Sequence, residues 1–506
     1  MHKKQKLLSN SITNIFAKFF NAIIQLISLP LLISVYSKEG YGLIAIAISL
    51  NTLISILQLG IPSGLPKFIA EWFAKKDYLT MQKVTSTVFS FYLFLAFVNL
   101  ALILIIRFFL VSYFKISPDQ IVVLKELLIV TAIFSFISFP VNFLDKLLAG
   151  VQELAFISKL QVIRTILFSG LVLAIFLRPN VLTLVQFYVI RCTIMIILVP
   201  LKLAKWLKYG TIETFFPKLA FKESVPLLKY CLQLFWIGTL MVLAEGLKPL
   251  VLSLRTPANA ATNMADYEII YKLVIFLRMI SASFVTALVP YISHEYFNGN
   301  KTIYKNVIQK VTKPIWAFGA LVVFLLILLS RELLVIYVGT ENLYLQKWLV
   351  LLLAGSLYIL YTPGISAVVI ASGRLLPYSI ATALASLVSL SVCWYLVPIS
   401  PLGGMIYSFI SYFSIIFVVV HFYYLPSIFN VSAFKHIKNV FIPPLFAGII
   451  MFFLIRFLLT RLNLASPYLT IFIGITSGVF LYSVIILLSY VKPREIRALV
   501  KSVVEK

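Results

Sequence analysis

A row of polar side chains in the first long apolar segment is the part of the sequence best placed to bind a ligand. Its members recur every three or four residues: Asn10, Asn14, Lys18, Asn21, Gln25 and Ser28. On a helix, at about 100° per residue, they share one face within an arc of roughly 80°. Such a face could line an aqueous cavity or hydrogen-bond a neighbouring helix. We favour the cavity, because Lys18 near mid-depth needs water or an anion.

Charged side chains also interrupt later apolar segments, at Arg191, Glu245, Lys248, Lys272 and Arg278. Glu245 and Lys248 can pair on one helix face, and their spacing leaves a structural pair and a functional role equally open. Arg278 has no nearby acid in its own segment, which favours a cavity, whereas Arg191 is left undecided. Because acids are few, a cavity lined by these cations would be electropositive and would favour an anion such as a phosphate.

Other kinds of chemistry find little support. A membrane glycosyltransferase or ligase usually needs acidic pairs or a large external loop, and neither is present. The sequence has no G-x-x-x-x-G-K-[ST] loop, so ATP is not bound by that motif. We therefore predict no enzyme activity, no metal and no cofactor. The residues that could ligate a metal are too scattered along the chain: Cys192, Cys231, Cys393, His2, His294, His421 and His436.

The elements that position these residues are membrane-spanning helices. Of the 506 residues 61% are hydrophobic and only 12% are charged, which is typical of a chain whose solvent is lipid. A spanning helix needs about 20 apolar residues, and we predict an all-α protein with about 14 such helices. The predicted spans are 10–35, 41–63, 84–111, 121–145, 155–177, 181–201, 226–252, 267–291, 315–338, 348–372, 378–396, 403–424, 439–455 and 468–490.

The cations are distributed unevenly between the gaps. The chain has 43 Lys and Arg against 17 Asp and Glu, and a net charge of +26. If the N-terminus is cytoplasmic, the inner gaps carry most of the lysines and the outer gaps few, as the positive-inside rule requires. We therefore predict a multi-pass protein of the cell (plasma or inner) membrane with both termini cytoplasmic. This pattern explains the basic balance without a nucleic-acid partner.

Short matches between the two halves indicate an internal duplication. Residues 82–85, QKVT, recur at 309–312, and Pro140 and Gly150 recur as Pro363 and Gly373 at nearly the same offset. We predict two parallel six-helix lobes related by a pseudo-twofold axis. The predicted parts are an N-lobe at 1–208, an amphipathic cytoplasmic linker at 209–225, a C-lobe at 226–425, two additional helices at 436–490 and a basic cytoplasmic tail at 491–506.

Three stretches resemble a known family: YSKEGYGLIAIAISLNTLISILQLGIPSGLPKFIAEW (36–72), LLAGVQELAFISKLQVIRTIL (147–167) and DYEIIYKLVIFLRMISASFVTALVPYISHE (266–295). They are similar to the polysaccharide-biosynthesis flippases, the O-antigen and capsule branch of the multidrug/oligosaccharidyl-lipid/polysaccharide exporter superfamily. The resemblance implies two six-helix lobes around a V-shaped cavity, alternating access, and cavity cations that meet the pyrophosphate of a polyprenyl-linked oligosaccharide. It also implies membrane lipid, and a polysaccharide polymerase or other assembly proteins, as partners.

Two related functions remain open at this point. Fourteen spans are also found in the lipid II flippase branch of the same superfamily, whose extra pair forms a groove for a lipid tail. The multidrug branch is the other alternative, with Glu245 as the coupling acid, but its sites are usually lined by acids. A Na⁺ gradient, an H⁺ gradient or the membrane potential could drive any of these transporters.

Overall fold

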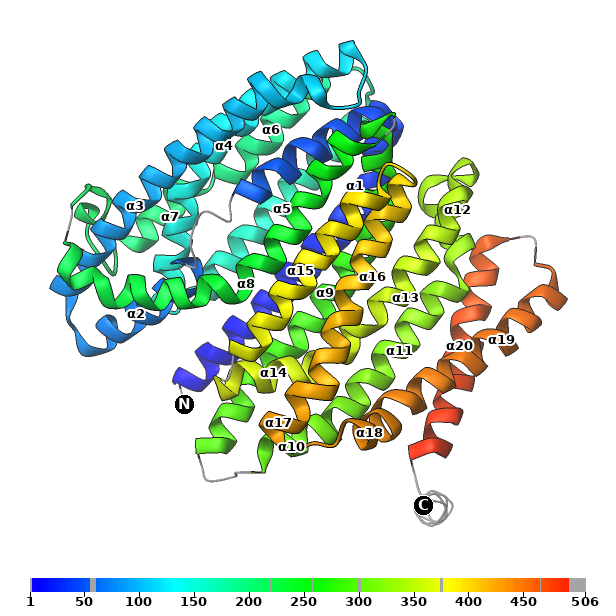
Figure 1. The fold of residues 1–506 in the computed structure, drawn as a ribbon. Helices are drawn as coiled ribbons and strands as arrows, with labels where there is room; N and C mark the ends of the chain where they lie inside the picture. Colours follow the sequence, from blue (N-terminus) through cyan, green and yellow to red (C-terminus); the bar gives the residue numbers. More distant parts are fainter. Residues whose placement is uncertain are drawn as a thin grey trace. The chain divides into compact units, whose positions relative to one another are not determined.

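Every regular element that the structure describes is a helix (Figure 1). The structure, a computed structural model, describes residues 2–54, 61–218, 220–256, 258–297, 302–373, 376–464 and 466–490. The predicted basic tail at 491–506 lies outside these residues, as does part of the predicted span 41–63. The all-α prediction is confirmed.

The first half of the chain forms long helices joined by short turns: α1 (His2–Ile54), α2 (Ile61–Lys75), α3 (Tyr78–Ile105), α4 (Pro118–Gly150), α5 (Leu154–Leu177), α6 (Leu184–Ile196), α7 (Val199–Trp206) and α8 (Phe221–Arg255). A π-helical turn η2 (Ile106–Leu110) and a 3₁₀ turn η3 (Val111–Tyr113) extend α3, and a second 3₁₀ turn is η4 (Ile212–Phe215).

The second half continues in the same way: α9 (Ala260–Phe297), α10 (Ile303–Asn306), α11 (Thr312–Leu328), α12 (Ser330–Val338), α13 (Gln346–Tyr361), α14 (Pro363–Ser372), α15 (Leu376–Leu396), α16 (Pro401–Val419), α17 (Leu425–Phe429), α18 (Ala433–His436), α19 (Ile442–Leu462) and α20 (Pro467–Tyr490). Its short turns are η5 (Val307–Val311), η7 (Val420–Tyr424) and η8 (Ile437–Phe441), which are π-helical, and the 3₁₀ turn η6 (Thr340–Leu345).

Among the described residues, twelve helical stretches are long and apolar enough to cross a membrane. This count takes α1 as one stretch, although α1 contains the predicted span 10–35 and the first part of the span 41–63, and it breaks between them at Ser37, where φ is 64°. It also leaves out α8, which has 35 residues. The expected number of about 14 is therefore an approximate but sound description of this multi-pass protein.

Local sequence signals define where several helices begin. Ser117 accepts a hydrogen bond from the backbone N–H of Gln120, whose side chain accepts one from the backbone N–H of Ser117. Thr183 and Gln186 form the same reciprocal pair at the start of α6. These capping boxes satisfy backbone donors that a helix start leaves free, so α4 and α6 begin where the sequence places S-x-x-Q and T-x-x-Q.

The helices form two compact units. Unit 1 comprises residues 1–269 and 382–408, and unit 2 comprises residues 270–381 and 409–506. The boundary passes through α9, α15 and α16, so it does not follow the two sequence repeats, and the limits of the predicted lobes stay a prediction. The core of unit 1 joins α3, α4, α7 and α8 through Tyr92, Phe143, Trp206 and Leu227.

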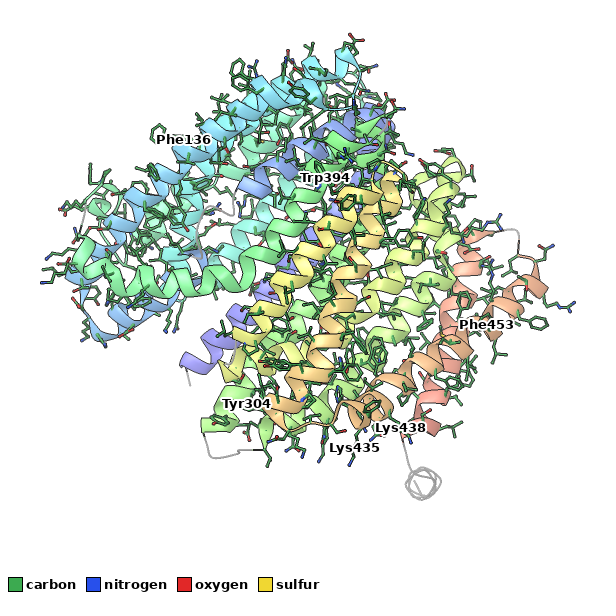
Figure 2. All side chains as sticks on the ribbon, in the orientation of Figure 1. Phe136, Tyr304, Trp394, Lys435, Lys438 and Phe453 are labelled. Atoms are coloured by element: carbon green, nitrogen blue, oxygen red, sulfur yellow. The ribbon has the colours of Figure 1, made fainter. Side chains whose placement is uncertain are left out.

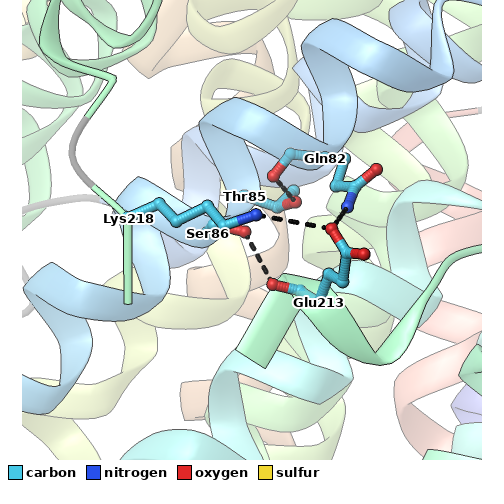
Figure 3. Close-up of polar contacts among 5 residues, drawn as sticks. All are labelled: Gln82, Thr85, Ser86, Glu213 and Lys218. Carbon is cyan, nitrogen blue, oxygen red and sulfur yellow. Dashed lines mark hydrogen bonds and ion pairs between the residues drawn. The ribbon is translucent and has the colours of Figure 1, made fainter. Parts of the chain in front are cut away.

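The predicted linker at 209–225 packs against α3 (Figure 3). The Glu213 carboxylate accepts a hydrogen bond from Gln82 at 2.5 Å and pairs with Lys218 at 3.4 Å, while the Ser86 hydroxyl donates to the Glu213 carbonyl. The Phe215 ring lies edge-on to Phe89, with centroids 5.4 Å apart. The apolar side of this amphipathic segment therefore covers the end of the helix bundle.

Unit 2 repeats this arrangement with the segment that comes after α17. Trp316 occupies the position in α11 that Phe89 occupies in α3, at nearly the same offset as the sequence matches. The Trp316 indole donates to the Phe441 carbonyl at 2.9 Å, and the two rings stack at 5.3 Å. Each half of the chain thus has an aromatic anchor after its last helix, as the predicted duplication would require.

The two predicted additional helices are α19 and α20, which pack as a pair beside α11 (Figure 1). Gly448 allows the close approach, because a Cβ there would lie 2.2 Å from the Phe324 ring. The Tyr482 hydroxyl of α20 donates to the Ala317 carbonyl of α11 at 2.8 Å. The pair is therefore an integral part of unit 2.

Candidate functional site

The predicted polar face of α1 can be followed in unit 1 from Asn14 to Gln25, whereas Ser28 is buried and its hydroxyl donates to the Ile24 carbonyl. The Gln25 amide donates to the Asn21 amide oxygen at 2.9 Å, which shows that the two side chains share a face. Lys18 and Gln25 are exposed, and Asn14 and Asn21 are half-buried. The face is therefore open along about two helical turns.

A second exposed face of α1 is apolar. Phe16, Ile23 and Ile27 are 59%, 39% and 51% exposed. At about 100° per residue they point roughly opposite to Lys18. Over its whole length α1 packs against α4, α5 and α8. Lipid suits the apolar face, whereas lysine and amide groups would lose hydration there, so the two faces require different surroundings.

Glu245 and Lys248 on α8 are brought together as an ion pair. The Lys248 Nζ lies 2.9 Å from the Glu245 carboxylate, and the Lys248 side chain is only 1% exposed. The charge of Lys248 is therefore balanced within its own helix. This geometry favours the structural interpretation that the spacing left open.

The predicted cations Lys272 and Arg278 lie on the part of α9 that belongs to unit 2, and both are half-buried. The guanidinium carbon of Arg278 is 5.6 Å from the ring centroids of both Tyr271 and Phe409. These rings can stabilise the positive charge of Arg278 through their π faces.

Arg191 lies among packed rings in unit 1. Its guanidinium carbon is 5.9 Å from the Phe168 centroid on α5 and 5.8 Å from the Tyr188 centroid on α6. Tyr188 in turn shares a hydrogen bond with Thr131 of α4 at 3.0 Å. These contacts give Arg191 a place in helix packing, a role the sequence could not decide.

An ion pair that the sequence did not predict ties the two halves of the chain together within unit 1. The Lys38 Nζ lies 2.6 Å from the Asp266 carboxylate, whose side chain is 6% exposed. Nearby, a Cβ on Gly42 would lie 1.9 Å from the Ala261 carbonyl oxygen, so only glycine allows α1 this close to α9. We call Lys38, Asp266, Gly42 and Ala261 the end seal of unit 1.

The loop between η3 and α4 reinforces the end seal. The backbone N–H of Lys115 donates to the Ser253 carbonyl, and the Lys115 carbonyl accepts from the backbone N–H of Ala260 at 2.8 Å. These bonds fix the turn between α8 and α9, where Thr256 caps the end of α8. Three separate segments of unit 1 therefore meet at the end seal.

The comparison with protein families is decisive. The family described as "Polysaccharide biosynthesis protein" matches residues 7–295, more than half of the chain. The chain belongs to this family. No curated protein matches its sequence.

Solved structures show which fold this polysaccharide biosynthesis protein has. The lipid II flippase MurJ in its inward closed conformation matches with a TM-score of 0.69 at 15% identity, over 94% of this chain and 98% of that one. An inward-facing multidrug resistance MATE family transporter of the MOP superfamily matches with a TM-score of 0.59 at 15% identity, over 81% and 96%. A MOP superfamily transporter from Pyrococcus furiosus gives 0.53 at 14%, over 88% and 95%. The family member has the MurJ/MATE transporter fold.

The histidines of this family member are not as scattered as the sequence suggested. His421 lies in η7 and His436 lies at the end of α18, yet their ring centroids are only 5.7 Å apart in unit 2. Within the described part of the chain, no group of three His, Cys, Asp or Glu residues could hold a metal. Like the Lys38–Asp266 pair, this contact joins separate helices, so no periodic signal in the sequence could reveal it.

Proposed function

We propose that the protein is a flippase that moves a polyprenyl-pyrophosphate-linked oligosaccharide, or a similar anionic glycolipid, from the cytoplasmic to the outer leaflet. Family membership and the transporter fold support this class of function. No bond is made or broken in such a step. The protein lowers the cost of moving charged and polar groups through hydrocarbon.

The two exposed faces of α1 are the observation that carries this proposal. A helix surrounded only by lipid would bury its polar face, and a helix surrounded only by water would bury its apolar face. In contrast, α1 exposes both Lys18 and the apolar side that carries Phe16. Lipid accounts for the apolar face, and an aqueous path accounts for the other. Lys18 would attract the pyrophosphate, and the amides of Asn21 and Gln25 would hydrogen-bond the sugar. The hydrocarbon tail would remain in lipid.

Alternating access gives the end seal a role in this proposal. The Lys38–Asp266 pair lies at the end that the charge pattern predicts to be extracytoplasmic. While the seal is intact, a head group on the polar face of α1 could not leave toward that side. Release would require the ion pair to separate, and its re-formation would return the protein to the cytoplasm-facing state.

Orientation and partners complete the proposal. We place the protein in the plasma or inner membrane with both termini cytoplasmic, because the lysine-rich gaps then face the cytoplasm. The lipid-linked substrate would be made on that leaflet. A polysaccharide polymerase or other assembly proteins would receive it on the outer side.

The structure gives less support to the multidrug alternative. Glu245, the carboxylate that an antiporter would use, is paired with Lys248. The Pyrococcus furiosus relative is described as having a binding pocket of reverse polarity that suggests a different function. A fold of this kind therefore accommodates pockets of either polarity. A flippase for lipid II-type substrates agrees with the proposal, because such substrates also have an anionic head group.

The test is transport by the full-length chain in proteoliposomes that contain a polyprenyl-pyrophosphate-linked oligosaccharide. A membrane-impermeant lectin measures how fast the sugar changes leaflet. We expect the protein to accelerate this movement and Lys18→Gln to slow it by about tenfold, since losing one charge-assisted contact of about 1.5 kcal/mol corresponds to that factor.

Lys83→Gln is the matched control. Lys83 is also an exposed lysine, but it lies on α3 and not on the polar face of α1. Its replacement should leave the rate unchanged. If the wild-type chain fails to accelerate transfer of the oligosaccharide lipid, or if both variants behave alike, the proposed function is wrong.

A further inference from the structure

A cluster of buried histidine, tyrosine and aromatic side chains lies at the π-helical turns η7 and η8 of unit 2. His421 belongs to η7, His436 precedes η8, and η5 leads into α11 next to them. Both histidines are buried, with exposed fractions of 0% and 1%. π-Helical turns disturb the regular backbone bonds and are often found at functional sites.

The hydrogen bonds of His421 define its protonation. Its Nδ1 lies 2.8 Å from the Phe417 carbonyl oxygen, which can only accept, so Nδ1 carries the proton. Its Nε2 lies 2.6 Å from the Tyr361 hydroxyl and must accept from it. His421 is therefore a neutral imidazole. The lone pair on its Nε2 accepts a hydrogen bond from the Tyr361 hydroxyl, which can itself also accept one.

His436 is the unexplained member of the cluster. Both of its ring nitrogens are buried and have no hydrogen-bond partner among the described residues. Burying an amide- or imidazole-like polar group without a partner costs about 1–3 kcal/mol. The His436 ring lies 6.0 Å from the Tyr361 ring and 5.7 Å from the His421 ring. A cost of this size indicates that the His436 nitrogens form a hydrogen bond in another state of the protein.

The surroundings restrict what this ligand can be. The Phe417 ring stacks on His421 at 4.2 Å, and the Tyr361 ring stacks on it at 5.4 Å, so their π faces can stabilise a cation. The titratable groups that face the cluster are Lys313 on α11, whose positive charge opposes a second cation nearby, and Tyr358 on α13. The described carboxylates of unit 2 lie on other elements, at Glu295, Glu332 and Glu341. Among the described residues, these carboxylates are therefore not available to bind a metal at the cluster. Both nitrogens of His421 are already hydrogen-bonded, so the cluster does not suit a metal ion.

We propose that Tyr361, His421 and His436 form a proton-binding site that holds one proton between them. The proton adds to the lone pair of His421 Nε2. The Tyr361 hydroxyl then accepts from this new N–H and turns its own hydrogen toward a nitrogen of His436. One positive charge is gained, no covalent bond other than the new N–H forms, and the orphaned nitrogen of His436 obtains a donor.

The site has a short route to water. Lys435, one residue before His436, is exposed, and Figure 2 shows Lys435 and Lys438 at the same end of unit 2 as Tyr304. The charge pattern predicts that this end faces the cytoplasm. A shift of one residue in the π-helical turns η7 or η8 would open the cluster toward that surface. Resting on the proposed function, the site would couple proton uptake to the transport cycle.

The first experiment is a titration of the histidines in the full-length chain. The protein is labelled with ¹⁵N-histidine, placed in liposomes without any transported lipid, and followed by solid-state NMR from pH 8.5 to pH 5. At high pH we expect His421 to show the neutral Nδ1–H form. On acidification we expect its unprotonated nitrogen signal to disappear together with a change of the His436 signals.

Tyr361→Phe and Tyr358→Phe are a matched pair that tests the connection. Both tyrosines are buried on α13, but only the Tyr361 hydroxyl is hydrogen-bonded to His421. We expect Tyr361→Phe to uncouple the two histidines, so that their signals change at different pH values. Tyr358→Phe should leave the joint transition in place.

Two results would overturn the proposal. If neither histidine changes between pH 8.5 and pH 5, the cluster is a permanently neutral packing element. If the joint transition persists in Tyr361→Phe, the hydroxyl does not connect the histidines. Because no substrate is present, these outcomes are independent of whether the lectin assay supports the flippase.

Discussion

At the level of single residues, the buried charges of unit 1 occur in pairs. Lys248 pairs with Glu245, and Lys202 pairs with Asp145 at 2.6 Å, with both lysine side chains only 1% exposed. Burying one partner alone would leave an uncompensated charge at a cost of several kcal/mol. Lys18 differs because it is exposed on a polar face. Paired burial thus marks the structural lysines, whereas Lys18 is a candidate for ligand binding because it is exposed and shares its face with Asn21 and Gln25.

The Lys38–Asp266 pair should control how often the end seal opens. Asp266→Asn removes one charge of the pair, and we expect the seal to weaken by about 1.5 kcal/mol, a value usual for hydrogen bonds to charged groups. Ser253→Cys, a buried position beside Lys115, then reports opening in a chain whose own cysteines have been replaced. Its labelling by an impermeant maleimide should become about tenfold faster.

A charge-reversed pair separates electrostatics from other effects of the substitution. Lys38→Asp combined with Asp266→Lys keeps opposite charges at the two positions. The labelling rate should return toward that of the wild type. Continued fast labelling in the double variant would show that the ion pair is not what closes this end.

The residues that the sequence could place are those whose partners lie on the same helix. The spacing of Glu245 and Lys248 allowed them to pair, and the polar row placed Gln25 and Asn21 on one face of α1. Lys38 and Asp266 are far apart in the chain and meet only because α1 and α9 pack closely. No local periodicity encodes that contact, and the same is true of the His421–His436 contact.

At the level of elements, hydropathy predicted helices well and their interruptions poorly. The predicted span 155–177 corresponds to α5, Leu154–Leu177. The break at Ser37 and the π-helical turns η5, η7 and η8 were not predicted. These features arise where tertiary contacts override a continuous apolar pattern. The two prolines of the repeat show the same limit, since Pro140 lies inside α4 whereas Pro363 begins α14.

The glycine that lets α19 approach α11 provides a test at this level. In a helix interior, Gly→Ala gains about 1 kcal/mol from helix propensity. At Gly448 this gain is opposed by a contact of 2.2 Å with the Phe324 ring, and overpacking costs about 1–3 kcal/mol. We expect Gly448→Ala to lower the midpoint of thermal unfolding in detergent, measured with a dye that reacts with the buried thiols of Cys231 and Cys393.

Gly170→Ala is the control for helix propensity alone. Gly170 lies within α5, and a Cβ there would meet nothing within 4 Å. Its midpoint should rise or stay constant. If Gly448→Ala raises the midpoint as much as Gly170→Ala does, the contact between α19 and α11 is looser than the structure indicates.

At the level of the whole molecule, the two halves of the chain share one structural feature that agrees with the predicted duplication. Both halves keep an aromatic anchor after their last helix, Phe215 on Phe89 in one and Phe441 on Trp316 in the other. Beyond the anchor the two halves differ. The first half continues into the helix α8, and the second continues into the pair α19 and α20. The titratable cluster at His421 belongs to the second half alone.

The charge pattern of the whole chain predicts its orientation, and the orientation sets the direction of transport. Single cysteines are placed at exposed positions in a chain without its own cysteines: Ser112→Cys, Thr340→Cys, Lys208→Cys and Lys435→Cys. If both termini are cytoplasmic, an impermeant maleimide should label the first two in intact cells and the last two only after the membrane is opened, because positively charged gaps stay inside. The reverse pattern would place the end seal on the cytoplasmic side, and the proton site would then face the exterior.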